Sequence, residues 1–200
     1  MARVARHRGL VAAAPAGEPQ AQTQILFTGP FKYSPESRFA LRALTDYVQI
    51  KLTETLREQL GGTYSPSVGG GGSREPRQEY AIQVSYGSSP ENVDTLARTV
   101  LALADTLKTR GPSPADVAKV REQLVRGREV QLKQNGYWLA NIAGRDQAGE
   151  PLAGLLGPYD EMVRNLTPAQ IQAAARQYLD TRNYARFVLL PEGGSAGAER

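Results

Sequence analysis

At four sites in this chain a helix-capping residue stands immediately before a proline and an amphipathic segment follows, and together these sites divide the sequence into helical blocks. A Ser or Thr side chain can accept a hydrogen bond from the first turn of a helix, and proline suits the first helical position because its missing N–H needs no partner there. Apolar residues recur every three to four positions after each site, as on an amphipathic helix. The sequence therefore predicts helices after Ser34-Pro35, Ser89-Pro90, Ser113-Pro114 and Thr167-Pro168.

Several segments outside these helices have the pattern of β-strands. Ile25–Phe27 is a short apolar run, residues 80–86 alternate between larger apolar and smaller polar side chains, and residues 185–190 form a second apolar run. Residues 63–68 predict a further strand. We interpret the next segment, Gly69–Gly72, as the flexible loop of a hairpin that returns through residues 80–86.

The order of these elements is strand, helix, two strands, several helices and a last strand. Such an order predicts an α+β fold in which helices pack on one face of a largely antiparallel sheet. A length of 200 residues is enough for one domain with a sizeable core. We expect the domain at residues 23–191, after a mobile N-terminal segment at 1–22 and before a disordered tail at 192–200.

The net charge of +4 does not indicate a nucleic-acid partner. Arg3, Arg6 and Arg8 lie in the first 17 residues, which hold no acid, and this leaves 21 basic against 20 acidic side chains beyond them. Without a basic stripe we expect neither nucleic acid nor a membrane surface as a partner. The apolar stretch Leu10–Ala14 is too short for a secretory signal, and the sequence assigns the chain to no particular cellular compartment.

Residue types needed for most metal and nucleophilic chemistry are rare in this sequence. It contains no cysteine and one histidine, His7, which lies in the arginine-flanked N-terminal segment. A thiol nucleophile, a histidine-based triad and a zinc site built on His or Cys are therefore excluded. Acids such as Glu54 and Glu122 occupy the spacings of solvated helix faces, and no pair stands out. We expect the chain to bind no metal or cofactor itself.

One segment, LREQLGGTY, combines two residues that could contact a substrate. Arg57 falls in the last turn of the first long helix, and Tyr64 starts the next strand seven residues later. The pattern alone favours a structural interpretation, because cations stabilise helix C-termini and tyrosine is common in strands. Tyr137 and Trp138, which follow a break at Asn135-Gly136, likewise favour helix packing over substrate contact.

The same segment resembles the insulinase (pitrilysin, inverzincin) family of zinc peptidases. In that family a C-terminal-type domain carries an arginine and a tyrosine seven residues apart, in a stretch resembling L-R-E-x-L-G-x-x-Y. The resemblance extends through ILFTGPFKYSPESRFAL, GPSPADVAKVREQL, QNGYWL and LTPAQIQAAARQYLD, and covers nearly the whole chain after about residue 22. The matching positions of the motif are Leu56, Arg57, Glu58, Leu60, Gly61 and Tyr64.

This resemblance implies a division of labour between two domains. A homologous domain with H-x-x-E-H and a distal glutamate binds zinc and activates water, and the arginine and tyrosine face it across a closing chamber. Tyr64 would donate its phenolic O–H to the oxygen of the attacked carbonyl, and Arg57 would hold a nearby substrate carbonyl. Because the chain has no H-x-x-E-H, we expect it to hydrolyse peptides only together with a zinc-bearing partner domain.

The departures from the family pattern leave a second function open. The family's domain opens with a strand and a helix before the ILFTG strand, and we expect both to be missing here, with one sheet edge uncovered. A non-catalytic scaffold or assembly subunit of the same fold is the alternative to a peptidase part. A zinc-motif domain encoded beside this one would favour the peptidase. Bacterial relatives are often exported, which makes a periplasmic parent enzyme compatible with the resemblance.

Overall fold

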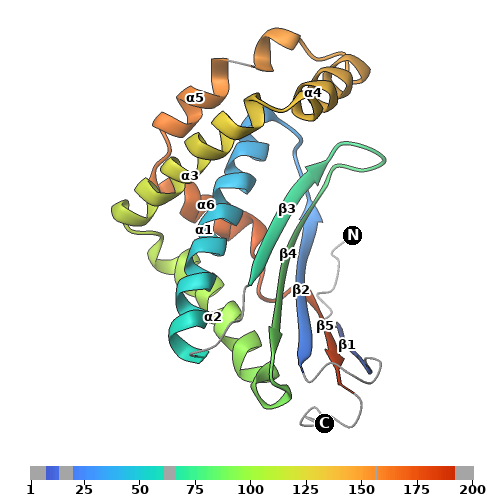
Figure 1. Cartoon of the computed structure of the whole chain (residues 1–200), viewed down its shortest axis with the longest axis vertical. Coiled ribbons are helices and arrows are strands. Elements are labelled where there is room, and N and C mark those ends of the chain that lie inside the picture. The colour runs from blue at the N-terminus through green and yellow to red at the C-terminus, as the bar shows by residue number, and fades with distance from the viewer. Residues whose placement is uncertain (1–7, 14–19, 61–65, 156, 192–200) are drawn as a thin grey trace.

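The computed structural model describes residues 8–13, 20–60, 66–155 and 157–191. They form a five-stranded sheet in the order β1-β5-β2-β4-β3, with the helices on one face (Figure 1). Neighbouring strands are antiparallel except for β1 and β5, which confirms the predicted α+β fold with a largely antiparallel sheet. The elements are β1 (Arg8–Ala13), β2 (Ala21–Pro30), α1 (Pro35–Leu60), β3 (Ser67–Ser73), β4 (Glu79–Ser88), α2 (Val93–Arg110), α3 (Pro114–Leu132), α4 (Asn135–Gln147), α5 (Gly157–Arg164), α6 (Pro168–Tyr178) and β5 (Tyr184–Leu190).

The cap-and-proline sites begin helices as predicted. Ser113 Oγ accepts the N–H of Asp116 at 3.1 Å. Thr167 and Gln170 form a reciprocal capping box, in which Thr167 Oγ1 accepts the N–H of Gln170 at 3.3 Å and Gln170 Oε1 accepts the N–H of Thr167 at 2.7 Å. After Ser89 a short 3₁₀ turn precedes α2. Helix starts could be predicted because the capping oxygen and the N–H that donates to it lie within one turn of each other.

The N-terminal segment contributes a strand that we did not expect. β1 runs parallel to β5, with Arg8 opposite Ala185 and Ala13 opposite Leu190. We expected residues 1–22 to be mobile and the strand before β2 to be missing. The pairing brings together the two ends of the chain, and six residues are too few for a local pattern to reveal it. β5 is therefore paired on both sides, and the edge strands of the sheet are β1 and β3.

The core lies between the sheet and the helices that cover it. On α1 the apolar stripe predicted from the sequence is buried at Leu44, Val48, Leu52 and Leu56. Side chains of β2 and β4 alternate between this core and the opposite face of the sheet. None of the helices in the described ranges has the length and apolar character of a membrane span.

Four consecutive glycines, Gly69–Gly72, lie inside β3, which corrects the prediction that they form the hairpin loop. The turn instead lies at residues 74–78. A Cβ atom on Gly72 would lie 2.1 Å from the Phe31 ring, and one on Gly70 would lie 2.9 Å from Thr45 Cγ2. The absent side chains let the helical layer approach the strand. The sequence pattern missed this strand because glycine has no side chain to show an alternation of apolar and polar positions.

Substitution by alanine should change the stability of the domain very differently at two neighbouring glycines of β3. Gly72→Ala forces the buried Phe31 ring to move, and we expect the free energy of unfolding to fall by about 1–3 kcal/mol. Gly71→Ala is the matched control, because its Cβ would meet no atom within 4 Å. That variant should unfold at the same urea concentration as the parent chain or slightly above it. Equal losses in the two variants would contradict the packing argument.

Arg128 on α3 is a charged side chain within the helical layer and is only 8% exposed. Its guanidinium donates to the Tyr137 hydroxyl and, at 2.5 Å, to the Leu155 carbonyl. It also lies over the Tyr159 ring, 4.9 Å from the ring centroid. Arg128 therefore ties α3 to α4, to α5 and to the turn between them. Tyr137 belongs to this contact, in line with the helix-packing role favoured from the sequence.

Candidate functional site

The two candidate residues belong to the end of α1 and to the connection between α1 and β3. Arg57 lies in the last turn of α1, where the sequence predicted it. Tyr64 belongs to residues 61–65, which lie outside the described residues. Its contact with a substrate, and its proximity to Arg57, stay predictions. The described structure provides the scaffold on either side of this connection.

Gln49 on α1 holds the start of β3 in place. Its side-chain amide donates to the Pro66 carbonyl at 2.8 Å and accepts the N–H of Val68 at 2.7 Å. These two hydrogen bonds clamp the backbone two residues after Tyr64 onto α1. The connection that carries Tyr64 therefore begins and ends on the same helix.

A cluster of charged side chains attaches the C-terminal half of α1 to α3. Lys51 Nζ lies 2.8 Å from Asp116 Oδ1 and 3.0 Å from Glu54 Oε2, and Lys119 Nζ lies 2.8 Å from Glu54 Oε1. Hydrogen bonds from Lys119 and then Lys51 hold the pKa of Glu54 below its ordinary value. Burial acts to raise the pKa of Asp116, but its hydrogen bonds, chiefly from Lys51, outweigh burial and lower it. The hydrogen bond to Asp116 raises the pKa of Lys51.

The stability of the domain should therefore decline on the acid side. Carboxylates with lowered pKa stabilise the fold above their unfolded values near 4, and this contribution is lost as the pH falls through their folded values. The raised pKa of Lys51 adds stability that is present below about pH 10.4 and lost above it. On acidification, the double variant Glu54→Gln, Asp116→Asn should lose less of its free energy of unfolding than the parent chain does. The difference should be about 0.5–1 kcal/mol per ion pair at these partly exposed sites. Urea unfolding at several pH values measures this difference, and identical acid slopes would refute it.

None of the described helices or strands covers the face of the sheet that turns away from the helices (Figure 1). Two adjoining hollows of about 370 and about 610 Å³ lie on it along β3 and β4. Both are bordered by Gly71 and Ala81, and the smaller one begins at Ser67, three residues after Tyr64. Small side chains leave room on this face for a ligand in an extended conformation. The smaller hollow thus begins at the N-terminal end of β3.

Within the described residues, no other groups that could carry chemistry are assembled into a site. No three His, Cys, Asp or Glu side chains within the described ranges are grouped in a way that could hold a metal ion. His7 lies outside the described residues. Burial raises the pKa of Tyr80 to about 12, and its ring packs edge-to-face on Tyr178 with centroids 4.9 Å apart. These phenols are part of the core.

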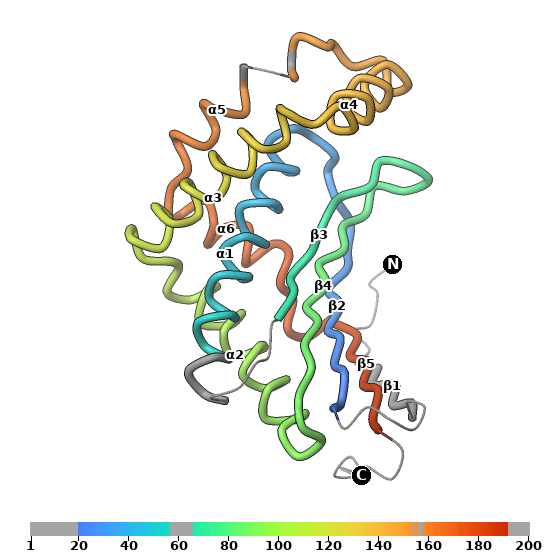
Figure 2. The backbone as a smooth tube through the Cα atoms, viewed as in Figure 1, coloured from blue at the N-terminus to red at the C-terminus, as the bar shows by residue number. Residues whose placement is uncertain are grey.

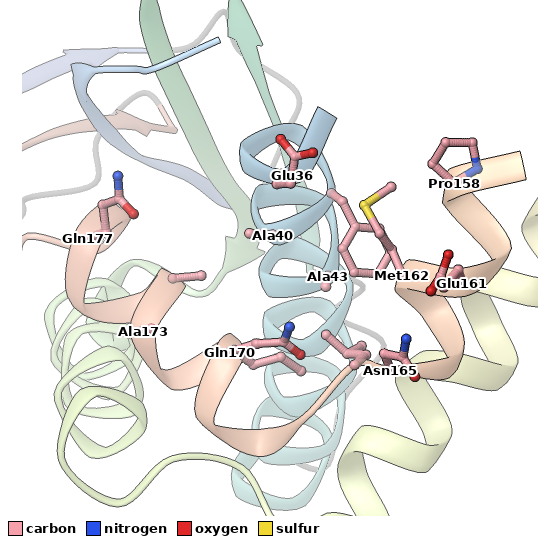
Figure 3. Close-up of a pocket in the computed structure, with 14 residues that line it drawn as sticks. Glu36, Ala40, Ala43, Pro158, Glu161, Met162, Asn165, Gln170, Ala173 and Gln177 are labelled. Atoms are coloured by element: carbon pink, nitrogen blue, oxygen red, sulfur yellow. The ribbon is translucent and has the colours of Figure 1, made fainter. Parts of the chain in front are cut away.

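A third cavity, of about 490 Å³, lies in the helical layer between α1, α5 and α6 (Figure 3). Its lining is largely apolar and includes Ala40, Ala43 and Met162, with the carboxylates of Glu36 and Glu161 at its border. It forms because α1 presents small side chains toward α6. The lining offers carboxylates and amides but no cation or phenol that could stabilise negative charge. We therefore place the candidate site on the open face of the sheet.

The family model described as the peptidase M16 inactive domain matches residues 5–124, a range that includes α1, β3 and both candidate positions. The chain belongs to the M16 inactive-domain family. This confirms the resemblance to a zinc-peptidase family that the sequence indicated. The match begins at residue 5, before the boundary that we predicted at residue 23, and it includes β1.

Solved structures share the fold of this M16 domain. The periplasmic protease PqqL from Escherichia coli superposes with a TM-score of 0.74 and 21% identity, over 94% of this chain and 21% of PqqL. An M16 inactive domain from Pseudomonas fluorescens superposes with a TM-score of 0.74 and 16% identity, over 93% of this chain and 44% of that protein. A protease from Helicobacter pylori superposes with a TM-score of 0.71 and 17% identity, over 92% of this chain and 44% of the protease. The chain thus spans less than half of each of these proteins. No curated protein matches it.

Proposed function

We propose that this M16 domain binds peptide substrates and stabilises the transition state of their hydrolysis, in a zinc peptidase whose metal is held by a separate H-x-x-E-H domain. Membership of the inactive-domain family is consistent with a non-catalytic part of such a protease and supports the proposal. The observation that carries the finer proposal is the α1–β3 connection. It follows the turn of α1 that holds Arg57, and Gln49 on α1 bonds to Pro66 and Val68 where it leads into β3, the strand that borders the hollows.

The hydrogen-bond donors of Tyr64 and Arg57 suit the roles proposed for them. Attack on a peptide carbonyl develops negative charge on the carbonyl oxygen, and a donor held in advance stabilises that charge most effectively. The phenol of Tyr64 supplies a single O–H donor for this oxygen. The planar guanidinium of Arg57 supplies several N–H donors that can hold a neighbouring carbonyl of the substrate. Activation of water belongs to the zinc of the partner domain.

A mixing experiment tests this proposal. The purified chain alone should not hydrolyse a fluorogenic peptide, and an M16 domain with H-x-x-E-H alone should be slow. Combined in equal amounts, the two should hydrolyse the peptide, and removal of zinc by a chelator should abolish the activity. If no M16 zinc domain encoded near this chain gains activity when it is mixed with the chain, the proposal is contradicted.

The scaffold function remains the second candidate, and it is favoured by the description of the family as inactive. In that case the chain would form a stable complex with its partner, as size-exclusion chromatography would show, without raising the partner's activity. Substitutions at Arg57 and Tyr64 would then leave every measured property unchanged. The two functions therefore give opposite results in the same set of samples.

A further inference from the structure

The helical layer contains a cavity that the proposed function does not use. It lies between α1, α5 and α6, whereas the two hollows lie on the opposite face of the sheet. Figure 2 shows the helices and the sheet as two adjoining layers. The volume of the cavity, about 490 Å³, falls in the range of pockets that hold small organic ligands. A ligand bound there would leave the hollows free.

The interior of this cavity is apolar. Ala40 and Ala43 on α1 and Ala174 on α6 line it and leave the space, because their side chains are small. Phe39 and Met162 supply larger parts of the wall (Figure 3). Such a lining favours a ligand with a body of aliphatic or aromatic carbon, which leaves water when it enters.

The border of the cavity is acidic. Glu36 lies in the first turn of α1 and Glu161 lies on α5, and Figure 3 draws their carboxylates on either side of Met162. Both glutamates are exposed, and neither forms an ion pair with any of the described residues. Hydrogen bonds from its own backbone N–H and from Ser34 lower the pKa of Glu36, so this carboxylate is charged at neutral pH.

No positively charged side chain of the described residues lines the cavity. Lys32 and Arg38 lie near enough to Glu36 to lower its pKa further, but neither borders the cavity. Asn165 and Gln177 add amide oxygens at the border, and these can accept hydrogen bonds from N–H groups. The border therefore suits a cationic head group and repels an anionic one.

We infer that this cavity binds a small organic cation, in which an ammonium group is attached to an apolar body. The ammonium would lie at the border, attracted by Glu36 and Glu161, and the body would fill the space beside Ala40 and Ala43. Because such a ligand would bridge α1, α5 and α6, it should also stabilise the folded chain. This inference goes beyond the proposed function and does not depend on it.

Three probes with one apolar body test the charge preference: phenylbutylammonium, phenylbutanol and phenylbutanoate. The chain has two methionines, Met1 and Met162, so labelling of the methionine methyls with carbon-13 gives an NMR signal from the cavity wall. Met162→Leu assigns that signal. The ammonium compound should shift it and bind about fivefold or more tightly than the alcohol, with the carboxylate weakest. Equal affinities, or no shift of the Met162 signal with about 10 mM ammonium compound, would overturn the inference.

Removal of the two carboxylates tests the head-group site. The double variant Glu36→Gln, Glu161→Gln should bind the ammonium compound about fivefold or more weakly and the alcohol as before. Glu122→Gln, Glu129→Gln on α3 is the matched control, because it removes two exposed carboxylates that do not border the cavity, and it should bind like the parent chain. A loss of the same size for the ammonium compound and the alcohol would overturn the inference.

A substitution that fills the cavity tests where the apolar body lies. Ala40→Leu should weaken binding of the ammonium compound by about tenfold or more. Ala140→Leu, at an exposed position of α4, is the matched control and should bind normally. Urea unfolding shows whether both variants are folded, and the carboxylate variant decides the question if Ala40→Leu is not. Normal binding by folded Ala40→Leu would place the ligand elsewhere and overturn the inference.

Discussion

Replacement of Tyr64 by phenylalanine should lower the turnover of the assembled zinc peptidase by about 100- to 1000-fold, which corresponds to about 2.7–4 kcal/mol of transition-state stabilisation. The variant loses a hydroxyl that is proposed to bond the carbonyl oxygen only as negative charge develops on it. The aromatic ring stays, so KM should change little and the loss should fall on kcat. Steady-state kinetics on a fluorogenic peptide measures both constants.

Two further variants make this result interpretable. Tyr33→Phe removes the hydroxyl that accepts a hydrogen bond from Arg38 at 3.2 Å, near the other end of α1, and it should leave kcat unchanged. Arg57→Ala should raise KM as well as lower kcat, because Arg57 is proposed to hold a substrate carbonyl before and during attack. Full activity in both Tyr64→Phe and Arg57→Ala would exclude the proposed roles and favour the scaffold function.

Replacement of Arg128 by alanine should lower the free energy of unfolding by about 3 kcal/mol. The substitution leaves the Leu155 carbonyl and the Tyr137 hydroxyl without their donor in a buried region, and it removes the group that lies over Tyr159. Unsatisfied buried polar groups and a new cavity each cost about 1–3 kcal/mol, and partial relaxation limits the sum.

Arg126→Ala on the same helix is the matched control for Arg128. Arg126 pairs with Glu122 on the surface and its side chain is 76% exposed, so its loss should change the stability by less than about 0.5 kcal/mol. Urea unfolding of both variants measures the difference. A loss of stability in Arg126→Ala as large as that in Arg128→Ala would show that burial of the guanidinium is not the cause.

Features that depend on neighbouring residues in the chain could be predicted from the sequence. The helix starts at Ser113 and Thr167 are local, because each cap bonds an amide three residues away. The buried stripe of α1 follows from the spacing of its leucines, and the same spacing placed Arg57 in the last turn. The candidate pair itself came from a motif of nine residues, LREQLGGTY, whose meaning rests on family resemblance.

The sequence by itself thus determined the fold class, the helix starts at Ser113 and Thr167, the family, and the absence of cysteine from the chain. Only the tertiary structure decided the β1–β5 pairing, the strand conformation of Gly69–Gly72 and the position of β3 at the edge of the sheet. Pairing between distant strands depends on chain segments that share no local pattern. The need for a glycine at a given position depends on the atoms that pack against it in the folded chain.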